Sequence, residues 1–155
     1  MTEKEAATNP DVNREVPDPL IRGLVRLFVY GSLRRAEYNH ARVNQWVPGE
    51  VLAHIADGYI TDAALHNLGV YPALVAGGGR VIGEVYDVPQ HLFNYINSME
   101  VGAGYEGRPV QVLIGDQKPD EEGPSINALA YFYTGGVNPA SRIPSGDWSL
   151  RSKEA

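Results

Sequence analysis

The chain has 155 residues, of which 43% are hydrophobic, and this is enough for one domain with its own hydrophobic core. Its formal net charge is −6 at pH 7, and the basic pair Arg34-Arg35 is too short to form a basic patch, so nucleic acid is not expected as a partner. The chain contains no cysteine, which excludes disulfides, thiolate chemistry and cysteine-ligated metal sites.

No segment approaches the roughly 18 apolar residues of a membrane span, and the N-terminal residues lack the hydrophobic segment of a signal peptide. We therefore expect no membrane partner and a cytoplasmic location. Residues 1–20 combine three prolines with charged side chains, and they are predicted to form a flexible arm. Residues 149–155 are predicted to be a flexible C-terminal tail, which leaves residues 21–148 as one domain. No feature of the sequence specifies an oligomeric state.

The first predicted strand leads directly into a turn of small residues. Residues 24–33 read LVRLFVYGSL, in which an apolar run ends in Tyr30-Gly31-Ser32-Leu33. Such a turn can aim backbone N–H groups at a ligand, so we expect the substrate to bind here. The turn does not fit a nucleotide site, because neither a P-loop lysine nor the three-glycine dinucleotide pattern follows it.

The middle of the chain alternates between a helical pattern and short β-type runs. Apolar residues at spacings of three and four predict a helix over residues 36–47, which Pro48-Gly49 ends. Strands are predicted over residues 50–57, 58–65 and 80–88, with turn chemistry over residues 67–72 before Ala73-Leu74-Val75. The run Gly77-Gly78-Gly79 is interpreted as a hairpin loop.

A second helix is predicted after Pro89, with an apolar stripe at Leu92, Tyr95, Ile96 and Met99, and it should stop near Glu100. Strands over residues 108–114 and 126–134 follow, separated by an exposed acidic loop around residues 116–122. The predicted order is β-α-β-β-β-α-β-β. Adjacent strands and few helices favour an α+β fold, with a small mixed β-sheet or barrel and two main helices.

Two carboxylates are candidates for proton transfer. Glu100 lies at the end of an apolar helical stripe, and Glu84 shares a strand face with Ile82 and Tyr86. Burial would raise the pKa of Glu100, whereas a nearby Arg108 would lower it. Spacing alone does not choose between the two carboxylates.

Nucleophilic and metal-dependent chemistry find little support in the sequence. Ser32 as a nucleophile would need a base that is held by a third group, but the histidines are scattered along the chain. No pair of them has metal-ligand spacing, so no metal site is predicted. The four are His40, His54, His66 and His91.

Several motifs occur in a fixed order along the chain. They are FVYGSL at 28–33, YPAL at 71–74, VIGEVYDV at 81–88, Glu100 followed by Tyr105 and Arg108, and IPSGDW at 143–148. In this order, over about residues 24–148, the chain resembles the gamma-glutamylcyclotransferase-like family, and the resemblance implies the fold of that family.

The resemblance also implies an activity and site residues. In a cyclotransferase the α-amine of a γ-glutamyl group attacks its own γ-amide carbonyl, which gives 5-oxoproline and a free amine or amino acid, with no cofactor or metal. The small-molecule γ-glutamyl substrate would be held by the turn residues Tyr30, Gly31, Ser32 and Leu33. Glu100 would be the general acid/base, and Tyr105 would add a hydroxyl to the pocket, with Tyr131 or Tyr133 as further candidates.

The chain departs from the family pattern around this glutamate. The family often has leucine-aspartate three or four residues earlier, where this chain has Ile96-Asn97, and the following glycine is replaced by Val101. The usual tyrosine-x-arginine is stretched to residues 105–108, so we expect a different backbone there. The alternative to an enzyme is a non-catalytic binding module, in which the same turn captures a carboxylate-bearing metabolite or peptide end.

Overall fold

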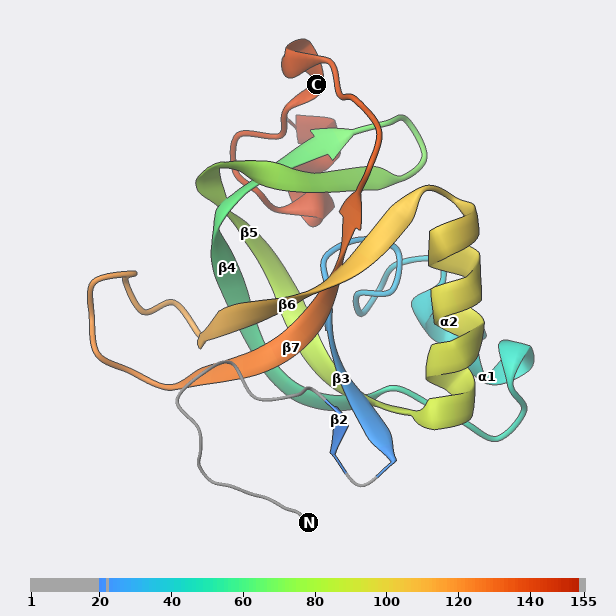
Figure 1. The fold of residues 1–155 in the computed structure, drawn as a ribbon. Helices are drawn as coiled ribbons and strands as arrows, with labels where there is room; N and C mark the ends of the chain where they lie inside the picture. Colours follow the sequence, from blue (N-terminus) through green and yellow to red (C-terminus); the bar gives the residue numbers. More distant parts are fainter. Residues whose placement is uncertain (1–19, 22, 154–155) are drawn as a thin grey trace.

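The computed structural model describes residues 20–21 and 23–153. The predicted N-terminal arm therefore lies outside the described residues, apart from Leu20. A six-stranded sheet forms the body of the molecule, with helix α2 along one side (Figure 1). The strands are β2 (Leu20–Ile21), β3 (Leu24–Val29), β4 (Ala53–Asn67), β5 (Pro72–Pro89), β6 (Tyr105–Ile114) and β7 (Ser125–Tyr133). The helices are α1 (Val43–Trp46) and α2 (Gln90–Gly102), with 3-10 helices at His40–Arg42, Pro139–Ser141 and Trp148–Lys153.

The sheet closes on itself. Its strand order is β2-β3-β5-β4-β6-β7, and all these neighbours are antiparallel. Strand β3 also pairs in parallel with β7, where Leu27 lies opposite Leu129. Because β3 contacts both β5 and β7, the sheet curls into a barrel, which removes most of its free edges. The predicted α+β fold with a mixed, curled sheet is confirmed.

Alternation along β3 divides the buried residues between two cores. Phe28 belongs to the cluster that includes Val81 and Val85 of β5, whereas Leu27 and Val29 point to the opposite face. That second face packs against α2 through side chains that include Leu92 and Ile96. Alternate residues of β5 also point to opposite faces, because Tyr86 and Val88 belong to the second cluster.

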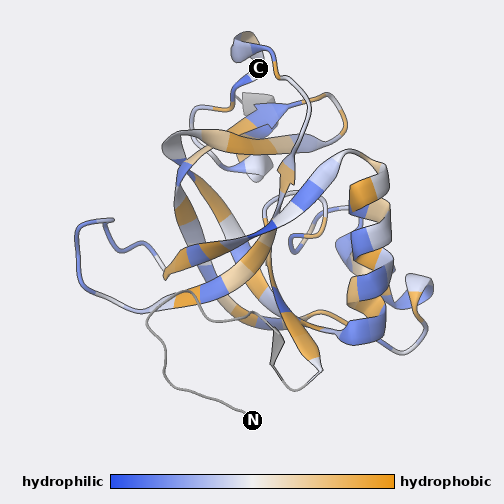
Figure 2. Ribbon diagram, in the orientation of Figure 1, coloured by the Kyte–Doolittle hydropathy of each residue, from blue (hydrophilic) through white to orange (hydrophobic). Residues whose placement is uncertain are grey.

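Helix α2 begins after Pro89 as predicted and continues two residues past Glu100. Polar and apolar residues alternate around it (Figure 2). The predicted stripe is only half right, because Tyr95 and Met99 are partly exposed. The Tyr95 ring stacks on Trp46 of α1, with ring centroids 5.3 Å apart, and Met99 lines a cavity that is described below.

The predicted hairpin loop at Gly77-Gly78-Gly79 is wrong. Strand β5 runs through these glycines, and the hairpin turn between β4 and β5 lies at residues 68–71, where the Leu68 N–H donates to Tyr71 O at 2.9 Å. The glycines mark a bulge instead, because Ala63 of β4 pairs with both Ala76 and Gly79. The separate runs predicted over residues 50–65 are likewise one long strand, and β2 precedes β3, so the predicted order of elements needs both corrections.

The first predicted helix is much shorter than expected. Only the 3-10 helix His40–Arg42 and the single-turn α1 occupy the predicted range 36–47. Ala36 has a positive φ of 69°, and Asn39 donates its backbone N–H to Ser32 O at 3.0 Å. The start of this stretch therefore folds back onto the turn after β3, and only its second half forms helical hydrogen bonds.

The C-terminal segment contains a short helix and is hydrogen-bonded to the long β4–β5 hairpin. Residues 148–153 form a 3-10 helix in which the Arg151 guanidinium lies 4.3 Å from the centroid of the buried Trp148 ring. Residues 154 and 155 lie outside the described residues. The segment before this helix is bonded to the long hairpin, where Ile143 N–H donates to Leu65 O and Ile82 N–H donates to Gly146 O, both at 2.8 Å. No helix within the described residues is long and apolar enough to cross a membrane.

Gly146 is the position where this packing tolerates no side chain. Its φ is +71°, and a Cβ placed there would lie 1.9 Å from Arg80 O. We expect Gly146→Ala to lower the free energy of unfolding by about 2–4 kcal/mol, because strain and a backbone clash combine. Urea denaturation measures the change. Gly136→Ala is the matched control, since a Cβ there meets nothing within 4 Å, and equal stability of the two variants would contradict the expectation.

Candidate active site

A cavity of about 290 Å³ opens beside the end of β3. Its walls come from the turn after β3, the β4–β5 turn, the C-terminal end of α2, and strands β6 and β7. All six site residues expected from the sequence line it, namely Tyr30, Gly31, Ser32, Leu33, Glu100 and Tyr105. The structure thus brings the expected residues together. Tyr131 and Tyr133 of β7, the two further candidates, line it as well.

The turn after β3 is tightly held and leaves donors available. Gly31 O accepts a hydrogen bond from Arg34 N–H at 3.0 Å. Gly31 also packs so closely on Pro72 that a Cβ would lie 2.6 Å from its Cγ, so only glycine fits there. None of the described residues accepts a hydrogen bond from the backbone N–H groups of Gly31, Ser32 or Leu33. These three N–H groups therefore remain free for a ligand.

Ser32 has no basic partner. Its Oγ accepts a hydrogen bond from Asn39 Nδ2 at 2.9 Å, and the nearest histidine in the chain, His40, contacts Leu33 O through Nδ1 at 2.8 Å. No histidine is among the described residues that line the cavity. The arrangement thus gives no support to a serine nucleophile. No group of three or more His, Asp or Glu side chains that could hold a metal occurs among the described residues.

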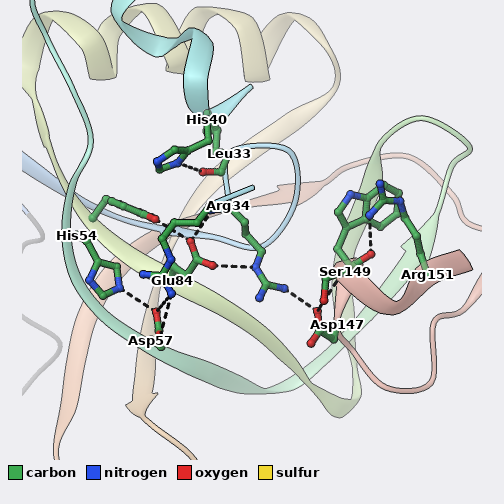
Figure 3. Close-up of polar contacts among 12 residues, drawn as sticks. Leu33, Arg34, His40, His54, Asp57, Glu84, Asp147, Ser149 and Arg151 are labelled. Carbon is green, nitrogen blue, oxygen red and sulfur yellow. Dashed lines mark hydrogen bonds and ion pairs between the residues drawn. The ribbon is translucent and has the colours of Figure 1, made fainter. Parts of the chain in front are cut away.

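Glu84 has a different environment from Glu100. It is buried in β5, and its carboxylate accepts hydrogen bonds from Arg34 Nε at 3.2 Å, Arg35 N–H at 2.9 Å and Tyr86 OH at 2.7 Å. Figure 3 shows Arg34 between Glu84 and Asp147, whose Oδ1 accepts from Arg34 Nη1 at 2.7 Å. Glu84 therefore anchors the end of the substrate turn to β5, and it is absent from the cavity wall.

Glu100 is half-buried at the last turn of α2 and faces the cavity. Burial raises the pKa of its carboxyl to about 7. Arg108 does not oppose this effect, because its Nε donates to Glu106 at 2.8 Å and its guanidinium lies over the Phe132 ring. The sequence left open whether burial or Arg108 has the larger effect on this pKa, and in the structure burial is the cause of its shift. A carboxyl with this pKa can both accept and donate a proton near neutral pH.

Three tyrosines surround Glu100, and each has its hydroxyl fixed. Tyr30 OH donates to Tyr131 O at 2.6 Å, Tyr105 OH to Pro72 O at 2.6 Å, and Tyr131 OH to Asn97 Oδ1 at 2.7 Å. Burial, followed by the charge of Glu100, raises the pKa of Tyr105 to about 12, and the same two causes raise the pKa of Tyr30 and Tyr131. All three hydroxyls therefore stay protonated, and their oxygens can still accept a hydrogen bond.

The cavity also contains residues that sequence analysis did not single out. Leu68 and Tyr71 come from the β4–β5 turn, Met99 from α2, and Asn39 from the segment that folds back on Ser32. Tyr71 belongs to the YPAL motif, which was a usable signal. Leu68 lies in the predicted turn over residues 67–72, but nothing in the sequence connected that turn with the site. Met99 was assigned to the apolar stripe of its helix, and Asn39 gave no signal.

Known proteins have sequences similar to most of this chain. The family-wide sequence model described as "Gamma-glutamyl cyclotransferase, AIG2-like" matches residues 27–150. The "Gamma-glutamylcyclotransferase family protein YtfP" of Escherichia coli strain K12 is 32% identical over 130 residues, which cover 83% of this chain and all of that protein.

Solved structures have the same fold. The crystal structure of PH0828 from Pyrococcus horikoshii superimposes with a TM-score of 0.60 at 28% identity, covering 83% of this chain and 94% of that one. The crystal structure of an AIG2-like protein from Mus musculus gives a TM-score of 0.61 at 23% identity, covering 77% of this chain and 83% of that one. The second likeness supports the fold alone.

The Glu84 contacts generate a stability prediction. Glu84→Ala removes the shared acceptor of Arg34, Arg35 N–H and Tyr86 OH, and breaking a buried ion pair on one side costs about 3–5 kcal/mol. Urea denaturation should show a loss of this size. Glu106→Ala is the control, because its ion pair with Arg108 is about half-exposed and is expected to contribute about 0.2–1 kcal/mol. Similar losses in the two variants would show that Glu84 does not anchor the turn.

Proposed function

The chain belongs to the gamma-glutamyl cyclotransferase, AIG2-like family, and we propose that it converts a γ-glutamyl amine or γ-glutamyl amino acid to 5-oxoproline and the free amine. The observation that carries this proposal is the position of Glu100. Its carboxyl shares one cavity with the free N–H groups of the turn after β3, and burial raises its pKa to about 7. An acid/base and oxyanion donors are the two components that amide cyclisation requires.

Glu100 performs the proton transfers in this proposal. Its carboxylate takes a proton from the substrate α-ammonium, and the resulting amine attacks the γ-carbonyl carbon, so that a new C–N bond forms. Protonated Glu100 then donates to the departing nitrogen as the old C–N bond breaks. The remaining extra proton on the ring nitrogen passes back to Glu100 and leaves with the released amine as its ammonium ion. A carboxylate of ordinary pKa would be a weaker base for the first step.

The turn residues supply binding and charge stabilisation. The N–H groups of Gly31, Ser32 and Leu33 are proposed to hold the glutamyl α-carboxylate or the oxyanion that develops on the γ-carbonyl oxygen. Holding the amine and the carbonyl of one substrate together also favours ring closure. Tyr105 also lines the cavity, and its hydroxyl oxygen can accept a hydrogen bond from the α-ammonium group.

The test is 5-oxoproline release from a panel of γ-glutamyl amines and amino acids. Glu100→Gln keeps the shape but removes the base, so we expect turnover to fall by about 10²- to 10⁴-fold. For the wild type, kcat/KM should fall as pH drops below about 7, because protonated Glu100 cannot accept the ammonium proton.

Glu106→Gln is the matched control for this experiment, because Glu106 lies exposed on β6 outside the cavity. It should leave both the rate and the pH profile unchanged. Full activity of Glu100→Gln would exclude Glu100 as the acid/base. A γ-glutamyl compound that binds tightly and is recovered unchanged would point instead to the binding module.

A further inference from the structure

The charges of the cavity limit which substrates fit. Glu100 is the single Asp or Glu among the described residues that line it, and none of these residues is Lys, Arg or His. A γ-glutamyl amino acid carries two carboxylates, one on the glutamyl part and one on the leaving group. The turn after β3 offers one group of N–H donors, which suits the glutamyl part.

The two arginines that follow this turn are not available for a second carboxylate. Arg34 is held between Glu84 and Asp147, as Figure 3 shows. Arg35 donates through Nη2 to both carboxylate oxygens of Asp57, at 3.0 and 3.1 Å. Neither arginine lines the cavity. A carboxylate on the leaving group would therefore find no cationic partner among the described residues that line the cavity, and the charge of Glu100 in the same cavity would repel it.

The outer wall of the cavity is apolar. Leu68 and Tyr71 of the β4–β5 turn and Met99 of α2 line it, and these residues are 42%, 56% and 37% exposed. Partly exposed lining residues lie where the cavity opens to solvent. An apolar substrate body placed here would cover hydrophobic surface that the protein leaves in contact with water.

From these charges and this wall we propose that the leaving group is an apolar amine, alkyl or aromatic, which carries no carboxylate and no charged group besides its reacting nitrogen. Leu68 and Tyr71 are then specificity-determining residues. This proposal rests on the proposed cyclotransferase function and narrows its substrate class. The site discriminates partly by rejection, since a carboxylate on the leaving group would have no cationic partner in the cavity.

The test compares three substrates that share the γ-glutamyl group. These are γ-glutamyl-phenethylamine, γ-glutamyl-phenylalanine, which adds only a carboxylate, and γ-glutamyl-methylamine, which lacks the apolar body. We expect kcat/KM for the phenethylamine conjugate to exceed both others by at least about tenfold. An equal or higher value for the phenylalanine conjugate would overturn the proposal.

A variant tests the assigned wall. The double substitution Leu68→Ala with Tyr71→Ala should reduce the preference for phenethylamine over methylamine to near one, mainly through a higher KM for the phenethylamine conjugate. Tyr38→Ala is the control, because Tyr38 is 71% exposed and lies outside the cavity wall, and it should keep the wild-type preference. An unchanged preference in the double variant would exclude Leu68 and Tyr71 as its source.

Different results would contradict the cyclotransferase function and the apolar leaving group. If the folded wild type releases no 5-oxoproline from any of the three conjugates, the proposed function fails and takes the substrate class with it. If it releases 5-oxoproline from all three with similar kcat/KM, the cyclotransferase function stands and only the apolar leaving group is excluded.

Discussion

The cost of removing one carboxylate from water governs this site. Glu100 lies at the end of α2 against a cluster of tyrosines, and burial raises its pKa to about 7. Arg108, the cation that was expected to lower this pKa, is paired with Glu106 instead. An arginine turned toward Glu100 would hold its pKa low and would turn the proton carrier into a permanently charged anchor. The pKa of Glu100 thus depends on which carboxylates the arginines of this acidic chain pair with.

The same principle explains the two arginines beside the substrate turn. Arg34 joins β5 to the C-terminal segment through Glu84 and Asp147, and Arg35 pairs with Asp57 of β4. These contacts fix the end of the turn, so that its free N–H groups keep one orientation beside the cavity. A preorganised set of dipoles needs no rearrangement when charge develops on a substrate. Glu84 thus acts on the site through the backbone of the turn, without touching the cavity.

Sequence reasoning located much of this site and missed its outer wall, for physical reasons. Local patterns can be recognised in a sequence, and two of them apply here: the apolar run ending in Tyr30-Gly31 and the helix ending near Glu100. The partners of Arg34 lie 50 and 113 residues away in the chain, so no spacing rule could separate Glu84 from Glu100 before the family resemblance was used. The three consecutive glycines were misassigned because a bulge in a long strand and a hairpin turn both favour glycine.

The measurement that tests the role of Glu100 most directly is an NMR titration of its side-chain carboxyl carbon in the wild-type protein, with the signal assigned by its loss in Glu100→Gln. Burial predicts a midpoint near pH 7, and the fall of kcat/KM at low pH should follow the same curve. A midpoint near the ordinary glutamate value of about 4.3 would show that the carboxyl is well solvated or paired with a cation. That result would contradict the proposed acid/base role.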